Sequence, residues 1–239
     1  GHSIVSIGAN AARNARIAAA SLERDAGATA LFRGTDLGVS TLASQTAGDA
    51  NLSFTTAPDL VGGGGSAGTT TMSILKGVVG DTTTSGNGFS ATGGLTTYDN
   101  DNGVRVLTGS EYTSAITDGQ TALDNVRLSN SSGAASNVTL DSNTTVNSLS
   151  LNVTAAASPI TLGGAGTLKL HSGVLYAWSS ATDTASTMTI DNTLDLNGGE
   201  GIVHFGTAGS SNGTGGALLR INGAITNDGA APVLLTLGG

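Results

Sequence analysis

Between residues 137 and 237 the sequence repeats one short pattern, of which Leu149-Ser150-Leu151 is a clear copy. The copies are apolar–polar–apolar triplets between turns rich in Gly, Asn and Asp: Val138-Thr139-Leu140, Leu149-Ser150-Leu151, Ile160-Thr161-Leu162, Leu168-Lys169-Leu170, Met188-Thr189-Ile190, Leu194-Asp195-Leu196, Leu219-Arg220-Ile221 and Leu235-Thr236-Leu237. Because successive side chains of a strand point to opposite faces, each triplet predicts a minimal strand that buries only one face.

A strand this short cannot hold a core by itself, so it needs an equivalent strand stacked about 4.8 Å above or below it. Four clear triplets begin at positions 149, 168, 194 and 219, in uneven steps. These steps predict a coil of roughly 20 to 25 residues with two or three strands per turn. The sequence therefore predicts an all-β fold, a parallel β-helix or β-solenoid with a protruding, loop-rich insertion.

The triplets also predict which side chains form the core. The polar middle residues Lys169, Asp195 and Arg220 should point to solvent, because a narrow and dry core cannot hold unpaired charges. The flanking apolar residues should point inward; they are Leu149, Leu151, Leu168, Leu170, Leu194, Leu196, Leu219 and Ile221.

The composition is typical of such a fold, with 37 glycines among 239 residues, 3% aromatic residues and 11% charged residues. Stacked small and branched side chains fill a narrow interior, and Gly, Asn and Asp serve its many turns. The formal net charge of −8 disfavours nucleic acid as a partner. The sequence has no Cys, which excludes disulfides and thiolate metal sites. No stretch reaches the roughly 18 apolar residues that a membrane helix requires.

The sequence predicts a division into three parts. Residues 1–55 should form N-terminal solenoid coils, 56–98 a Gly/Thr-rich insertion or loop, and 99–239 further coils that we expect to continue beyond this sequence. Within the first part, residues 9–24 have good helix propensity, but their apolar spacing favours a thin strand. The glycine run 62–66 has the composition of a flexible linker.

Several segments resemble the autotransporter-associated β-strand repeat proteins, which are large, Gly/Ala/Thr-rich surface or secreted proteins of bacteria. The resemblance rests on 21–34, 57–63, Ser73-Ile74-Leu75, Tyr98-Asp99, 103–108, 163–170 and 194–199. It implies a right-handed β-helix with adhesive or structural roles at the outer cell surface or outside a bacterial cell. It carries over no catalytic residues and no cofactor.

Residues 98–103 place oxygen ligands at alternate positions, as calcium loops do, so Asp99 and Asp101 are weak calcium candidates. The glycine at position 103 comes one position too early for an EF-hand, and Ser110 stands where a bidentate Glu would be required. The competing interpretation is an Asx-rich turn before a strand.

Two further sets of residues suggest alternative functions. Tyr176 and Trp178, close to His171, form the only aromatic group in the sequence; exposed aromatic rings stack on sugar rings, which would suit a glycan-binding adhesin. They could equally complete a strand. The acids Asp191 and Asp195, with His204 and Arg220, could line the groove of a β-helix polysaccharide lyase or hydrolase. The acids do not form a dense cluster, so we expect no enzyme.

The ends of the predicted solenoid suggest its function. A coil end exposes unpaired backbone groups above an apolar core unless a polar cap covers it. The residues that should make the ends adhesive are Ile4, Val5, Ile7, Val233, Leu235 and Leu237. We therefore expect a structural module of a bacterial surface or extracellular fibre, whose partners are copies of itself or flanking repeats of the same chain, with surface glycans as the alternative partner.

Overall fold

The computed structural model describes residues 1–85, 90–181, 183–207, 216–228 and 234–238. In these ranges the chain is all-β apart from one 3-10 turn, η1 (Gly109–Glu111). It forms two compact units, whose boundaries differ from those of the three predicted parts. Unit 1 contains Gly1–Val61 and Ser73–Thr108, and unit 2 contains Gly62–Met72 and Gly109–Gly239. The predicted insertion is thus divided between the two units.

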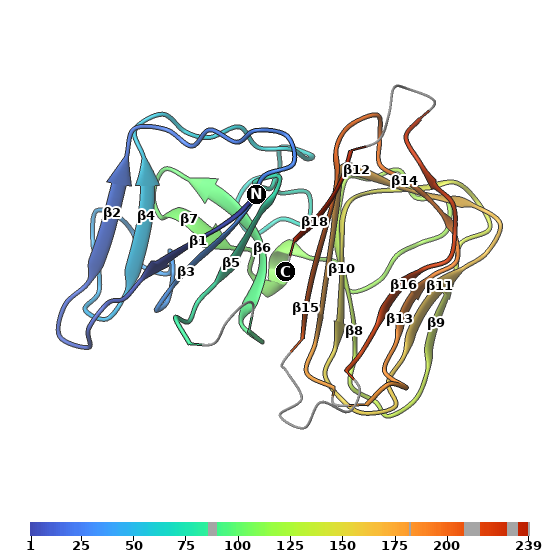
Figure 1. Ribbon diagram of the computed structural model, residues 1–239. Helices are drawn as coiled ribbons and strands as arrows, with labels where there is room; N and C mark the ends of the chain where they lie inside the picture. Colours follow the sequence, from blue (N-terminus) through green and yellow to red (C-terminus); the bar gives the residue numbers. More distant parts are fainter. Residues whose placement is uncertain (86–89, 182, 208–215, 229–233, 239) are drawn as a thin grey trace. The chain divides into compact units, whose positions relative to one another are not determined.

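Unit 2 is a solenoid whose strands all pair in parallel, which confirms the predicted parallel β-solenoid (Figure 1). Its coils have three faces. Face one consists of β8 (Asn125–Asn130), the second half of β10 (Thr144–Val153), the second half of β12 (Thr167–Ser179), β15 (Gly201–Thr207) and β18 (Leu235–Gly238).

Face two is a separate sheet on the opposite side of the solenoid in Figure 1. It contains β9 (Ser136–Thr139), β11 (Ile160–Gly163), β13 (Met188–Ile190) and β16 (Leu219–Ile221). Face three contains the first halves of β10 and β12, then β14 (Thr193–Asp195) and β17 (Ile225–Thr226). Each predicted triplet of the second half thus lies in or beside a strand.

The strand register corrects the predicted coil length. Leu149 pairs with Leu175, and Leu168 pairs with Leu194. One coil here has 26 residues. The same separation lies between Asn192 and Gly166, which a hydrogen bond joins across these two coils. The steps from 149 to 168 and from 194 to 219 join strands on different faces and are not coils. Along face one, equivalent positions are Asn125, Ser148, Val174, Ile202 and Thr236, so the coils lengthen toward the last.

The core of unit 2 consists of the apolar residues that the triplets predict. Leu149, Leu168 and Leu170 are fully buried, whereas Leu219 and Ile221 in the last coil are only partly buried. Arg220 is exposed and Lys169 is half-buried, as expected of outward residues. Asp195 departs from the prediction, because it lies on the outer surface yet is only 7% exposed.

Polar side chains at the corners hold successive coils together. Asp118 accepts a hydrogen bond from the Ser142 amide (2.7 Å), and Asp141 accepts one from the Ala165 amide (3.2 Å), in each case 24 residues later. The buried Asn192 donates to the carbonyl of Gly166 (2.9 Å). A side chain at position 166 would overlap a backbone carbonyl of the preceding coil, so this corner requires glycine.

Unit 1 begins with a parallel stack and ends with antiparallel strands. Its first sheet is β1 (His2–Ile7), β3 (Thr29–Gly34), β5 (Val78–Asp81), β6 (Gly93–Asp99) and β7 (Gly103–Val106), with antiparallel pairing only between β5, β6 and β7. A second sheet pairs β2 (Ala15–Ala19) with β4 (Ala50–Phe54), so the strand interpretation of residues 9–24 is confirmed in part. β5 and most of β6 lie within 56–98, so much of this segment belongs to the sheet.

Candidate functional site

In the last coil of unit 2, no described strand covers the solenoid core. β16, β17 and β18 each pair with one strand only among the described residues. Between β15, β16 and β18 lies an apolar hollow of about 460 Å³. We call it the end hollow. It is lined by Val203, Phe205, Leu219, Ile221, Leu235, Leu237 and Gly238.

The end hollow continues the core and opens to solvent. Phe205, Leu219 and Ile221 pack against the core on one side. Leu235 and Leu237 are 39% and 74% exposed. Large apolar side chains are costly to leave in water, and the unpaired strand edges beside them offer hydrogen-bonding groups. The hollow can therefore accept another β-coil, whose apolar side chains would fill it while its strands extend the sheets.

The predicted adhesive residues at the start of the chain have different environments. In β1, Ile4 is 49% exposed, Val5 is half-buried, and Ile7 is 5% exposed and belongs to the core of unit 1. β1 pairs only with β3 among the described strands, so one of its edges is unpaired there. Of the predicted residues at the other end, Leu235 and Leu237 line the end hollow, and Val233 lies outside the described residues.

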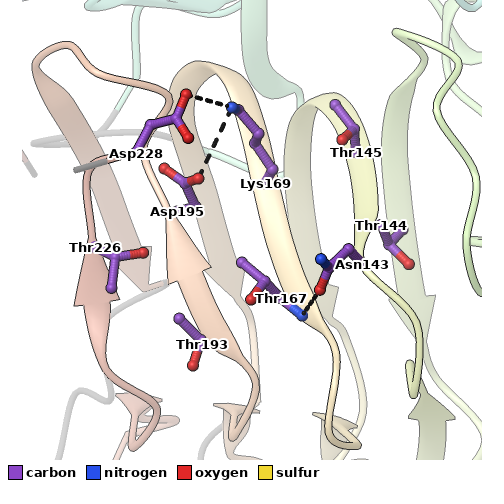
Figure 2. A pocket seen from close by; sticks show the side chains of 9 residues that line it. All are labelled: Asn143, Thr144, Thr145, Thr167, Lys169, Thr193, Asp195, Thr226 and Asp228. Atoms are coloured by element: carbon purple, nitrogen blue, oxygen red, sulfur yellow. Dashed lines mark hydrogen bonds and ion pairs between the residues drawn. The ribbon is translucent and has the colours of Figure 1, made fainter. Parts of the chain in front are cut away.

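A second feature is a polar groove of about 450 Å³ on face three, which the sequence analysis missed (Figure 2). We call it the threonine groove; its lining residues are Asn143, Thr144, Thr145, Thr167, Lys169, Thr193, Asp195, Thr226 and Asp228. The signal was present in the sequence as Thr167-Leu168-Lys169 and Thr193-Leu194-Asp195, which recur one coil apart.

Lys169 is the one basic residue among the described residues that line the threonine groove. Its Nζ donates a hydrogen bond to Asp228 at 2.9 Å and lies 3.9 Å from Asp195 Oδ2. The hydrogen bond to Asp228 raises the pKa of Lys169 above its ordinary value, and the charges of the two carboxylates act in the same direction. The ammonium group therefore stays charged at neutral pH, between two acids.

The calcium candidates form the Asx turn that was the competing interpretation. Asp99 Oδ1 accepts hydrogen bonds from the amides of Asp101 (3.1 Å) and Asn102 (2.6 Å), and its Oδ2 accepts one from Arg105 Nε (2.7 Å). Both carboxylate oxygens of Asp99 thus have protein donors. Within the described ranges, no group of three or more His, Cys, Asp or Glu side chains could hold a metal ion.

The aromatic group is not open to solvent. Tyr176 is 1% exposed and Trp178 is 4% exposed, both in β12. His171 is half-buried, and its carbonyl accepts a hydrogen bond from Asn197 (2.9 Å). In this arrangement neither ring presents a face on which a sugar could stack.

The residues considered for polysaccharide cleavage lie on three different faces. Asp195 lines the threonine groove, and His204 is buried in β15 on face one. Asp191 follows β13 on face two, where it accepts a hydrogen bond from Asn222 (2.8 Å), and Arg220 is exposed on β16. The structure therefore does not bring these four side chains together.

Comparison with known proteins adds no relative. No helix among the described residues is long and apolar enough to cross a membrane. No family model, no curated protein and no solved structure matches the chain.

Proposed function

We propose that the chain is a structural and interaction module of a bacterial surface or extracellular fibre, and that it associates end to end by β-solenoid stacking. The observation that carries this proposal is the end hollow, where an apolar core and three singly paired strands meet solvent together. The resemblance to surface repeat proteins supports the location, and the partner is a copy of the chain or a flanking repeat.

A coil is the occupant that best fits the end hollow. The strands below it are parallel and present apolar side chains at alternate positions, so a further strand of the same pattern would satisfy both the backbone groups and the apolar surface. The acidic charge of −8 disfavours side-by-side packing of copies, because like-charged flanks repel each other. Association is thereby directed to the ends.

Pairing of the end hollow of one copy with β1 of another copy joins two different surfaces. Such head-to-tail contacts do not close on themselves unless a rotation makes a ring, so they generate filaments. The first strand β1, with Ile4 exposed and one edge unpaired among the described strands, is the surface that we pair with the end hollow.

The experiment measures association of the purified chain by sedimentation velocity and electron microscopy across a dilution series. Leu237→Glu should block the end hollow, and Ile4→Glu should block the β1 end. Val39→Glu is the matched control, because Val39 is a large apolar residue that is 64% exposed outside both surfaces. We expect the wild type and the control to form filaments and each blocked variant alone to be monomeric.

Mixing the two blocked variants tests the polarity of the contact. Each retains the surface that the other lacks, so the mixture should form dimers that cannot grow. Wild-type protein that stays monomeric at high concentration would overturn the proposal. Dimers of Ile4→Glu alone would show that two end hollows meet each other and would overturn head-to-tail stacking.

A further inference from the structure

The threonine groove crosses successive coils in a regular way. One row of outward residues runs Thr145, Lys169, Asp195, Thr226, each paired with the next in the parallel register. A second row places Thr167 beside Thr193. Neighbouring strands of a sheet lie about 4.8 Å apart, so the groove offers one set of polar groups at each step along the solenoid axis.

Many of these groups have capacity for a ligand. The hydroxyls of Thr145, Thr167 and Thr193 make no hydrogen bond to any described residue, and all three side chains are half-buried. A Thr hydroxyl is both donor and acceptor, so it suits a partner that is itself a hydroxyl. Figure 2 shows these side chains along the wall of the groove.

The pair Lys169 and Asp195 provides the most specific part of the groove. Their charged atoms are 3.9 Å apart, which is too long for a direct hydrogen bond. A hydroxyl placed beside both could accept from Lys169 Nζ and donate to Asp195 Oδ2. The other oxygen of Asp195 accepts from the Asn197 amide at 2.8 Å, which fixes the orientation of the carboxylate.

The charge of the groove excludes strongly charged ligands. Its one ammonium group, on Lys169, is already compensated by Asp195 and Asp228, so an anionic polymer would meet a net negative groove. A metal cation would have to approach beside the ammonium group, which repels it. Hydroxyl-rich and uncharged ligands meet neither penalty.

We propose that the threonine groove binds a segment of a neutral polysaccharide, which lies along the solenoid axis across β10, β12, β14 and β17. Extended sugar chains carry hydroxyls on every residue at a spacing close to that of stacked strands, so successive sugars would meet polar groups at each coil. Single hydrogen bonds of this kind are weak, and their repetition along the groove supplies the affinity. This site is separate from the end hollow and does not depend on end-to-end association.

The test is affinity electrophoresis of the whole chain in native gels that contain one soluble polysaccharide each. The neutral probes are hydroxyethylcellulose, mixed-linkage β-glucan, xyloglucan and galactomannan, and the anionic probe is polygalacturonate. The end-blocked variant Leu237→Glu serves as the background, so that filament formation does not affect mobility. We expect retardation by at least one neutral probe and none by polygalacturonate. Retardation by no neutral probe, or by polygalacturonate alone, overturns the proposal.

Variants locate the site. Thr193→Val removes one hydroxyl at nearly constant shape, and it should weaken binding about three- to tenfold, as the loss of one hydrogen bond predicts. Asp195→Asn should weaken it at least as much, because the charged acceptor is lost. The matched control is Thr161→Val, since Thr161 is a half-buried outward threonine in β11 on face two. Equal loss in the control, with unchanged melting temperatures in all variants, would place binding elsewhere and overturn the proposal.

Discussion

At its β8 end the solenoid of unit 2 is covered by the chain, whereas at its β16–β18 end no described strand covers the core. The Asn125 amide in β8 donates to the Thr70 carbonyl (2.7 Å), and the Arg127 amide donates to the Thr113 carbonyl (2.8 Å). The guanidinium of Arg127 also lies 3.6 Å from the centre of the Tyr112 ring. At the other end, Leu237 remains 74% exposed.

The difference between the two ends shows that a segment can cap the solenoid although its sequence has no pattern typical of a cap. The segment 62–72, whose residues 62–66 have the composition of a flexible linker, provides two carbonyls to Asn125 of β8, and its Gly68 amide donates to the buried Glu111 (2.9 Å). A side chain at Gly65 would overlap a threonine of the same segment, so small residues let this backbone fold closely. Its contribution is made by backbone hydrogen bonds, which side-chain patterns do not report.

The largest expected effect compares a leucine inside the stack with one at the open end. Leu170→Asp places an unpaired charge at a fully buried position and should lower the free energy of unfolding by about 3–5 kcal/mol. Leu237→Asp alters an exposed side chain and should change it by no more than about 0.5 kcal/mol in the monomer. Urea unfolding followed by circular dichroism measures both. Similar midpoints for the two variants would show that the end is not open.

The second prediction compares two corner glycines. A side chain at either Gly166 or Gly223 would overlap a backbone carbonyl of the preceding coil. The Gly166 carbonyl also accepts a hydrogen bond from Asn192 in the next coil, which fixes its position. Gly166→Ala should therefore lower the free energy of unfolding by about 1–3 kcal/mol, as overpacking does. Gly223 lies in the last coil, which can shift, so Gly223→Ala should cost less. The reverse order of melting temperatures would contradict a free last coil.

The third prediction concerns the capped end. Asn125 is fully buried; it donates to the Met72 carbonyl (2.8 Å) and accepts from Asn147 and Ser148 (both 2.8 Å). Asn125→Ala should therefore destabilise unit 2 by about 1–3 kcal/mol and speed hydrogen exchange in 62–72. Asn137→Ala, at an exposed position in β9, is the control and should have little effect. Unchanged exchange in 62–72 would mean that this segment does not depend on Asn125.

The smallest expected effect concerns the ion pair between Lys169 and Asp228, which links residue 228 to the coil two turns earlier. The pKa of Lys169 is raised in the folded chain. The stability that its ion pair contributes is therefore fully present below the ordinary pKa of 10.5 and is lost as the pH rises through the raised pKa. Asp228 is largely exposed, so the contribution is small. We expect Lys169→Met to speed hydrogen exchange of residues 225–228 at neutral pH. In stability measurements, the difference from wild type should vanish at high pH, and a difference that grows there would contradict the pairing.

The fold could be predicted because alternation is a local property. In Leu168-Lys169-Leu170 the two leucines are buried and the lysine is not, and nothing beyond these residues was needed to see it. Which strand stacks on which could not be predicted, because Leu149 and Leu168 have the same pattern but lie on different faces. The threonine groove and the covered Asp195 depend on that pairing. So does the burial of the Tyr176 and Trp178 rings, for which the sequence left an exposed patch and a place within a strand both open.

The lengthening of the coils from the β8 end to the β18 end has a mechanical consequence. When the chain is pulled from its last residues, the β18 coil is the first to unwind, since no described strand covers it, and the coils beneath follow in order. An unwound residue adds roughly 3.4 Å of contour length. The force trace should therefore show steps that shorten from about 115 Å for the last coil to about 80 Å for the coil next to β8. Each rupture would thus report by its length which coil of the solenoid had given way.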